Sequence, residues 1–390
     1  MSEGILGFIL PNEFHVHWSF MIVLYPYITG IIAGAFIMSS LYHVFNIKAL
    51  KPVSRFSLIF AFAFWTCCTL PLLNHLGHPE RAFNMLITPS PTSAMAGFGY
   101  IYGSYGLLLI GEILLVYRKT LVDLYHNSSG FLKKIYWLLT FGVTEVTPQS
   151  LEADKKVIKF LAAIGIPWAC LLHGYVGFIF GGVKAVHWWF TPLMPVVFLL
   201  SASVSGIAGI VLLYVLIMKY RGEEPDMNCL KTCVKFLWGF FILDLTMELL
   251  DIGAHAYLRV EHWHIVAGLL AGPLNFTFWK LQMGVFSLIP FLLLAWLSLF
   301  NVSDSTLKFF APLVSLMILI QVILMRWNVV IGGQLISKSG RGYTHFHLEF
   351  LGKEGLLVGL IILALPLVVL YVLSKIFPLW YPAKPEAQAS

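Results

Sequence analysis

Four ionisable residues occur at regular spacing within an otherwise apolar stretch, residues 240–257. Asp244, Glu248, Asp251 and His255 are separated by four, three and four positions, which puts all four on one face of a helix. A carboxylate at membrane depth costs several kcal/mol unless it is protonated, paired or hydrated. We therefore interpret the stripe as a route for protons, enclosed by other helices. The alternatives are a hydrogen-bond ladder between helices, or a helix end that lies outside the lipid.

A second polar cluster lies just beyond an apolar span that ends near residue 74. It contains His75, His78, Glu80 and Arg81. A quinone headgroup needs hydrogen-bond donors for its carbonyls and a source of protons for its reduction, and histidine supplies both near neutral pH. The cluster therefore indicates a quinone site at a membrane boundary. A polar interfacial loop is the alternative interpretation.

Two further polar residues lie inside apolar spans. His173 lies within LLHGYVGFIFG and Glu112 within LLLIGEILLVYR. Ionisable residues at membrane depth are functional candidates by default, so both could extend a proton route inward. The alternative for His173 is a core histidine whose hydrogen bonds are satisfied within the protein. The alternative for Glu112 is a structural pairing with Arg326 or Lys280.

The cysteines and histidines give little support for a metal centre. None of the five cysteines forms a CxxC pair, which argues against a zinc or iron–sulfur site and against a disulfide framework. A b-type haem would need two facing histidines at one depth. His75, His173 and His255 leave that alternative open, although no helix carries a repeated histidine pair.

Composition defines the class of protein. The chain has 390 residues, of which 59% are hydrophobic and 11% charged, and its mean hydropathy is +0.83. A soluble domain carries about 25% charged residues. We expect an all-α, multi-pass membrane protein rather than a soluble enzyme with an anchor. The net charge of +6 requires no nucleic-acid partner, and residues 1–18 lack the pattern of a cleavable signal peptide.

Nine apolar stretches are long enough to span a bilayer. They cover about residues 20–45, 55–74, 98–117, 157–179, 193–219, 231–257, 276–300, 306–328 and 354–376. Most Lys and Arg residues lie in the loops that would be inside if the amino terminus is outside, so the positive-inside rule favours amino terminus out and carboxy terminus in. Residues 130–143 are too short to span, and we expect an amphipathic helix along the inner surface.

Several segments, in this order, resemble the NrfD/PsrC family of quinone-interacting membrane subunits, and especially its DsrP-type and QrcD-type members. The segments are LPNEFHVHW, YPYITGIIAGAF, HPERAFN, TPSPTSAMAGFGYIYGSYGLLLIGE, LLHGYVGFIFG and RWNVVIGGQLISKSGRGYTHFHLEF. The resemblance implies two four-helix bundles followed by a carboxy-terminal helix. It also implies menaquinone or ubiquinone bound near the outer face, beside an iron–sulfur, ferredoxin-like partner subunit. A multihaem cytochrome in the same complex, and a role in sulfur metabolism, follow by analogy.

The resemblance assigns roles to individual positions. Tyr25 and the loop that contains His75, His78, Arg81 and Asn84 match the quinone pocket. Polar positions on the third, fourth and sixth helices match the suspected proton carriers of the family. With the stripe, the predicted proton pathway comprises Glu112, His173, Asp244, Glu248, Asp251 and His255.

Together these observations predict a subunit of a respiratory oxidoreductase in a prokaryotic cytoplasmic membrane. We expect it to hold no haem or iron–sulfur cluster and to depend on partners for catalysis. The expected organisation is an outer segment (1–19), a first bundle with the quinone pocket (20–180), a second bundle (181–330), an outer loop with the last span (331–378) and an inner tail (379–390). An ion or solute transporter, a b-type cytochrome and a structural anchor are the alternatives.

Overall fold

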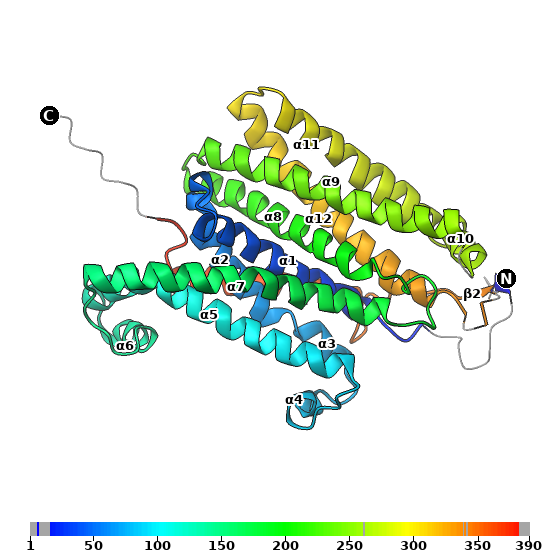
Figure 1. The fold of residues 1–390 in the computed structure, drawn as a ribbon, viewed down its shortest axis with the longest axis horizontal. Helices are drawn as coiled ribbons and strands as arrows, with labels where there is room; N and C mark the ends of the chain where they lie inside the picture. The colour runs from blue at the N-terminus through cyan, green and yellow to red at the C-terminus, as the bar shows by residue number, and fades with distance from the viewer. Residues whose placement is uncertain (1–5, 8–15, 260–261, 338, 341, 382–390) are drawn as a thin grey trace.

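A computed structural model describes residues 6–7, 16–259, 262–337, 339–340, 342–381 of the chain. Most of the expected outer segment, 1–19, lies outside the described residues, as do residues 260–261 and the end of the inner tail, 382–390. The described part is almost entirely helical, which confirms the predicted all-α class (Figure 1).

The nine predicted spans all lie in helices. The elements are β1 (Leu6–Gly7), α1 (Phe20–His43), η2 (Lys48–Leu50), α2 (Lys51–Cys67), α3 (Leu70–His75), η3 (Pro79–Arg81), α4 (Asn84–Ile87), α5 (Ala94–Asn127), α6 (Gly130–Leu139), α7 (Pro148–Gly181), α8 (Met194–Arg221), α9 (Met227–Leu258), α10 (Trp263–Ala271), η4 (Asn275–Leu288), α11 (Ile289–Leu299), α12 (Asp304–Gln334), β2 (Gly342–Tyr343) and α13 (Leu356–Ile376).

Eight of these spans are apolar enough to cross a membrane by length and composition, within the described residues. The remaining span, the sixth along the chain, is α9. It has 32 residues, but each of its 18-residue windows holds at least three Lys, Asp or Glu residues. It nevertheless packs on α8 and α11, among the other spans. Its acidic face is therefore turned toward protein, which is the arrangement that membrane depth requires.

Side chains that accept backbone N–H bonds fix where several helices begin. Ser19 caps α1 and Ser93 caps α5, while Thr147 and Ser150 form a reciprocal capping box at the start of α7. Asp226 caps α9 in the same way. The first turns of a helix leave N–H groups unpaired, and these oxygens satisfy them.

The centre of the molecule is the contact between α1 and α8. Gly34 on α1 and Gly206 on α8 face each other, and a Cβ on either would meet backbone atoms of the opposite helix. Small residues let the two backbones approach closely, as is common between membrane helices. α1 also packs on α2 and α7, and α8 packs on α9 and α12. The first four spans and the next four thus meet along this contact, while the domain boundaries themselves stay predictions.

Two of the spans are not continuous α-helices. The second is divided into α2 and α3, with a break after Cys67. The seventh begins as a π-helix, η4, and continues as α11. The Ser287 hydroxyl donates to the Gln282 carbonyl inside η4, at 2.8 Å. π-helical turns often mark functional sites, and here the turn carries a buried glutamine into the bundle.

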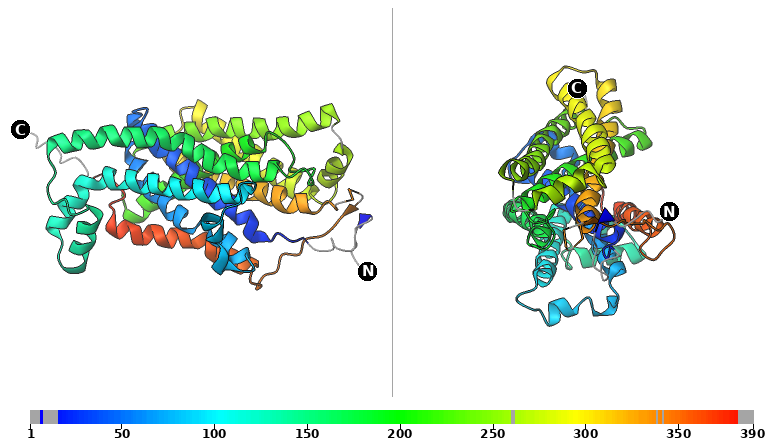
Figure 2. Two further views of the ribbon diagram at one scale, coloured as in Figure 1. Left: turned by 60° about the horizontal axis from the view of Figure 1, so that its bottom comes forward. Right: turned by 90° about the vertical axis from the view of Figure 1, so that its right-hand side faces the viewer.

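The two ends of the helix bundle differ. The amino-terminal end carries α3, α4, α10 and the β1–β2 pair, and the opposite, carboxy-terminal end carries α6 (Figures 1 and 2). β1 and β2 are antiparallel, with Leu6 opposite Tyr343. A short helix, α6, forms over residues 130–139 of the predicted 130–143, and its Phe131 and Leu138 are exposed; its place on the inner surface stays a prediction. The names amino-terminal end and carboxy-terminal end are used for these two faces below.

Candidate functional site

The stripe on α9 enters the protein interior as its spacing predicted. Asp244 and Glu248 are buried, with 1% and 7% of their surface exposed, and Asp251 and His255 are partly buried. The Thr191 hydroxyl donates to Asp251 Oδ1 at 2.6 Å. His255 Nδ1 lies 2.7 Å from the Asp251 carbonyl oxygen and 3.5 Å from its carboxylate. The stripe thus runs from a partly exposed helix end into the core.

Glu248 begins a chain of amide side chains that leaves α9. Gln282 Nε2, on the π-helix, donates to Glu248 Oε1. Asn328 Nδ2, on α12, donates to Gln282 Oε1 at 2.7 Å, and Asn328 Oδ1 accepts from the Thr277 hydroxyl at 2.7 Å. Because each link is a side-chain hydrogen bond in a dry interior, the chain fixes the orientation of the Glu248 carboxyl group.

Arg326 is the buried cation of this region. Its guanidinium donates to His173 Nε2 at 3.0 Å, to the Ser201 hydroxyl at 2.6 Å and to the Phe198 carbonyl at 3.2 Å. It also lies over the Phe198 ring, 3.8 Å from the centroid. Arginine cannot accept, so His173 Nε2 is the acceptor and its hydrogen is on Nδ1.

Arg326 also lies within electrostatic reach of Asp244 and Glu248. Opposite charges that share a dry interior attract strongly, and each compensates part of the other's desolvation. Several atoms here have no hydrogen-bond partner among the described residues, including Asp244 Oδ1, Glu248 Oε2 and His173 Nδ1. Four helices, α7, α8, α9 and α12, therefore bring exchangeable protons and their acceptors into one cluster, which we call the Arg326 network.

Glu112 stands outside the Arg326 network. It is fully buried on α5, and neither of its carboxyl oxygens has a partner among the described residues. Its helix packs on α2, α6 and α7, and Tyr105 is close to it. The alternative, in which Glu112 is a structural partner of Arg326 or Lys280, is therefore wrong, since neither forms a hydrogen bond with Glu112 among the described residues.

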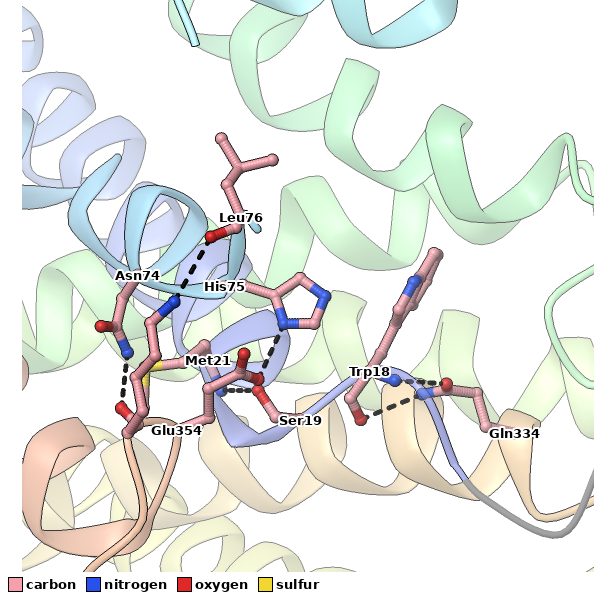
Figure 3. Close-up of polar contacts among 9 residues, drawn as sticks. Trp18, Ser19, Met21, Asn74, His75, Leu76, Gln334 and Glu354 are labelled. Carbon is pink, nitrogen blue, oxygen red and sulfur yellow. Dashed lines mark hydrogen bonds and ion pairs between the residues drawn. The ribbon is translucent and has the colours of Figure 1, made fainter. Parts of the chain in front are cut away.

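His75 forms a pair with a carboxylate at the amino-terminal end. Its Nδ1 lies 2.8 Å from Glu354 Oε2, in the segment that precedes α13, and both side chains are about a quarter exposed. Asn74 donates to the Lys353 carbonyl at 2.8 Å, and Lys353 Nζ donates to the Leu76 carbonyl at 3.4 Å (Figure 3). These contacts fasten the end of α3 to the start of the last span and hold the imidazole in place.

The other predicted quinone residues differ in their surroundings. Tyr25 is buried on α1, its ring packs edge-on against Phe98 at 5.3 Å, and its hydroxyl has no partner among the described residues. His78 just before η3, Arg81 in η3 and Asn84 in α4 are exposed. No hydrogen bond between described residues joins these three to Tyr25 or His75.

Sequence reasoning missed several members of these clusters. Gln282, Asn328, Thr191, Ser201 and Glu354 were not singled out. Two of them carried a signal, because an amide within an apolar span, as in FWKLQMGVF and LMRWNVVIG, must find a partner. Glu354 carried none, since its pairing with His75 joins positions far apart in the chain.

Comparison with known proteins gives a match to one family model. Residues 11–338 match the model described as "Polysulphide reductase, NrfD". The match covers eight of the nine spans and both polar clusters, apart from Glu354.

Three relatives illustrate the range of matches. A selenate reductase subunit of Mesobacillus selenatarsenatis is 30% identical over 338 residues, which are 85% of this chain and 76% of that protein. A tetrathionate reductase subunit of Archaeoglobus fulgidus is 27% identical over 326 residues, 83% of this chain and 82% of that protein. The Hdr-like menaquinol oxidoreductase integral membrane subunit of the same organism is 24% identical over 268 residues, 68% and 58% respectively.

Proposed function

This chain belongs to the NrfD family, and we propose that it is the quinone-reactive membrane subunit of a reductase complex. In this role the bound quinone exchanges electrons with a redox partner and exchanges protons with side chains of this chain. Support comes from two relatives named as subunits of a selenate reductase and a tetrathionate reductase, and from a third named as the integral membrane subunit of a menaquinol oxidoreductase.

The observation that carries the proposal is the pair formed by His75 and Glu354. Oxidation of a quinol needs a group that accepts its hydroxyl proton, and reduction of a quinone needs the same group as a donor. Glu354 holds His75 through Nδ1 at 2.8 Å. Nε2 is then the nitrogen available to a headgroup, and the carboxylate stabilises the ring once it is protonated. We place the headgroup beside this nitrogen.

Tyr25 and the exposed loop complete the proposed pocket. Tyr25 brings a buried hydroxyl without a protein partner among the described residues, which suits a headgroup carbonyl that needs a donor. It lies six positions along α1 from Ser19, whose helix end is next to His75 (Figure 3), and six residues of helix cover about 9 Å. His78, Arg81 and Asn84 are exposed at the boundary, where they would orient the headgroup as it enters.

For protons we propose a route through the Arg326 network. His255 and Asp251 lie near the amino-terminal end of the bundle, and Glu248 and Asp244 follow more deeply. His173 joins them through Arg326, and Glu112 would extend the route on α5 toward the carboxy-terminal end. The proposal rests on the burial of these ionisable groups and on their atoms without a partner among the described residues, since ionisable groups at membrane depth are candidates for proton transfer.

The orientation and partners follow from charge and from chemistry. We propose that the amino-terminal end faces outward in a prokaryotic inner membrane, because the basic loops gather at the other end. An iron–sulfur subunit would dock on the amino-terminal end, close to His75, with a multihaem cytochrome as a further partner. Menaquinone or ubiquinone would be the substrate, because both present the carbonyls that these donors suit.

Turnover in membranes tests the proposal. With the native complex assembled, His75→Gln and Glu354→Gln should each slow quinol-linked electron transfer at least tenfold. His126 is the matched control, because it is a histidine at the carboxy-terminal end with one hydrogen bond, from Nε2 to the Thr144 carbonyl at 2.7 Å. His126→Gln should leave turnover unchanged. Wild-type turnover in both test variants would refute this pocket.

A further inference from the structure

A cavity of about 1220 Å³ lies at the carboxy-terminal end, far from the His75 pair. It is bounded by the last turns of α8 and α13 and by the first turn of α2. Its apolar wall consists of leucine and isoleucine side chains on the two long helices: Leu213, Ile217, Leu367 and Leu370. Leu367 is 44% exposed, so the cavity is open toward the side of the bundle that faces lipid.

Two lysines at this cavity have no acidic partner among the described residues. Lys51 begins α2 and lies 5.1 Å from the Tyr381 ring centroid. Lys375 is in the last turn of α13 and lies 4.8 Å from the Tyr371 ring centroid. Both ammonium groups thus rest on aromatic rings, which attract a cation without neutralising it.

The carboxylates that line the same cavity are already engaged. Arg221 donates twice to Glu223, at 2.9 and 2.7 Å, and Lys308 donates to Glu224 at 2.6 Å. The Asp226 side chain accepts from a backbone N–H of α9 as its cap. Among the described residues neither Lys51 nor Lys375 forms an ion pair with these carboxylates, so both ammonium groups can contact an outside anion.

We propose that this cavity binds one anionic phospholipid. The phosphate of the lipid contacts Lys51 and Lys375, and an acyl chain lies along Leu213, Ile217 and Leu367. A basic pocket between membrane helices, at the end where the helices leave the lipid, is the arrangement that recognises acidic headgroups. Tyr381 lies beside Lys51, Tyr371 lies beside Lys375, and Trp380 lines the same cavity. Tyrosine and tryptophan are enriched where membrane helices meet lipid headgroups.

The site would also hold the last span against the bundle. α13 packs on α2 and α1, while the cavity separates its carboxy-terminal turn from α8. A lipid in this space bridges α8 and α13. The lipid site is independent of the quinone proposal, because none of the residues that line it belongs to the quinone pocket or to the Arg326 network.

Native mass spectrometry of the delipidated full chain, titrated with phosphatidylglycerol or with phosphatidylcholine, tests the site. Each basic contact contributes about 1 kcal/mol at a membrane surface, so Lys51→Gln with Lys375→Gln should weaken phosphatidylglycerol binding about 30-fold. The matched control is Lys133→Gln with Lys134→Gln on α6, which removes the same charge at the same end, including a lysine 4.9 Å from the Tyr125 ring. The control should bind as the wild type does.

Blocking the apolar wall gives a second readout. Ile217→Trp fills the space for the acyl chain and leaves both lysines in place, so it should abolish tight phosphatidylglycerol binding without changing the charge. Thermal denaturation of each variant checks that it is folded. Equal binding of both lipids by the wild type, wild-type binding by the double lysine variant, or an equal loss in the α6 control would each overturn the proposal.

Discussion

Arg326 on α12 and His173 on α7 are joined by a hydrogen bond of 3.0 Å in the middle of the protein. Both side chains are fully buried. The bond connects a helix of the first four spans to one of the second four, and the same guanidinium is close to Asp244 and Glu248 on α9. One cation on α12 thus organises polar groups of α7, α8 and α9.

Loss of Arg326 should therefore be costly. Arg326→Gln removes the buried hydrogen bonds of the guanidinium to His173, Ser201 and the Phe198 carbonyl. Each buried acceptor left unpaired costs about 1–3 kcal/mol, so the total cost should be about 3–5 kcal/mol. We expect the free energy of unfolding, measured in mixed detergent micelles, to fall by that amount. Arg221→Gln removes an exposed pair with Glu223 and should cost less than about 1 kcal/mol. A similar, small effect of both substitutions would show that Arg326 has no such role.

Glu248→Gln should slow turnover or separate it from proton movement. The glutamine keeps the size of the side chain, yet it cannot carry a proton between its neighbours. Proteoliposomes with the native complex and a pH-sensitive dye measure the protons moved per electron. Glu152→Gln, on the exposed face of α7, is the control. If Glu248→Gln keeps both the rate and the proton ratio of the wild type, Glu248 is structural.

The contact between α1 and α8 should not tolerate a methyl group. In Gly206→Ala the new Cβ would meet backbone atoms of Gly34 and Ala35, which cannot move aside as a side chain can. Overpacking of this kind costs about 1–3 kcal/mol. At Gly239 on α9 a Cβ meets no atom within 4 Å, so Gly239→Ala should be neutral or stabilise by up to about 1 kcal/mol. Equal melting temperatures for the two variants would contradict the close packing.

The sequence predicted the helices better than the contacts between them. Local periodicity can be read directly from the sequence. It gives the hydropathy of each span and the helical spacing of Asp244, Glu248, Asp251 and His255. The break after Cys67 and the π-helical start of the seventh span were missed, because both depend on how neighbouring helices pack rather than on a local motif.

The site was predicted residue by residue but not as a set of contacts. His173 was a candidate and Arg326 was noted, yet their bond joins positions that are 153 residues apart. His75 and Glu354 are 279 residues apart. Such pairs follow from the tertiary arrangement. Gln282 and Asn328 could have been found, since buried amides in apolar spans demand partners.

Binding of a fluorescent quinol analogue to the purified chain tests the quinone proposal most directly. The titration compares the wild type with His75→Ala and with the His126→Ala control at the opposite end. Saturable binding in the wild type and the control, weakened at least tenfold in His75→Ala, is the predicted result. Saturable binding that is unchanged in His75→Ala, or no saturable binding by folded wild-type protein, would contradict a quinone site at His75 and Glu354.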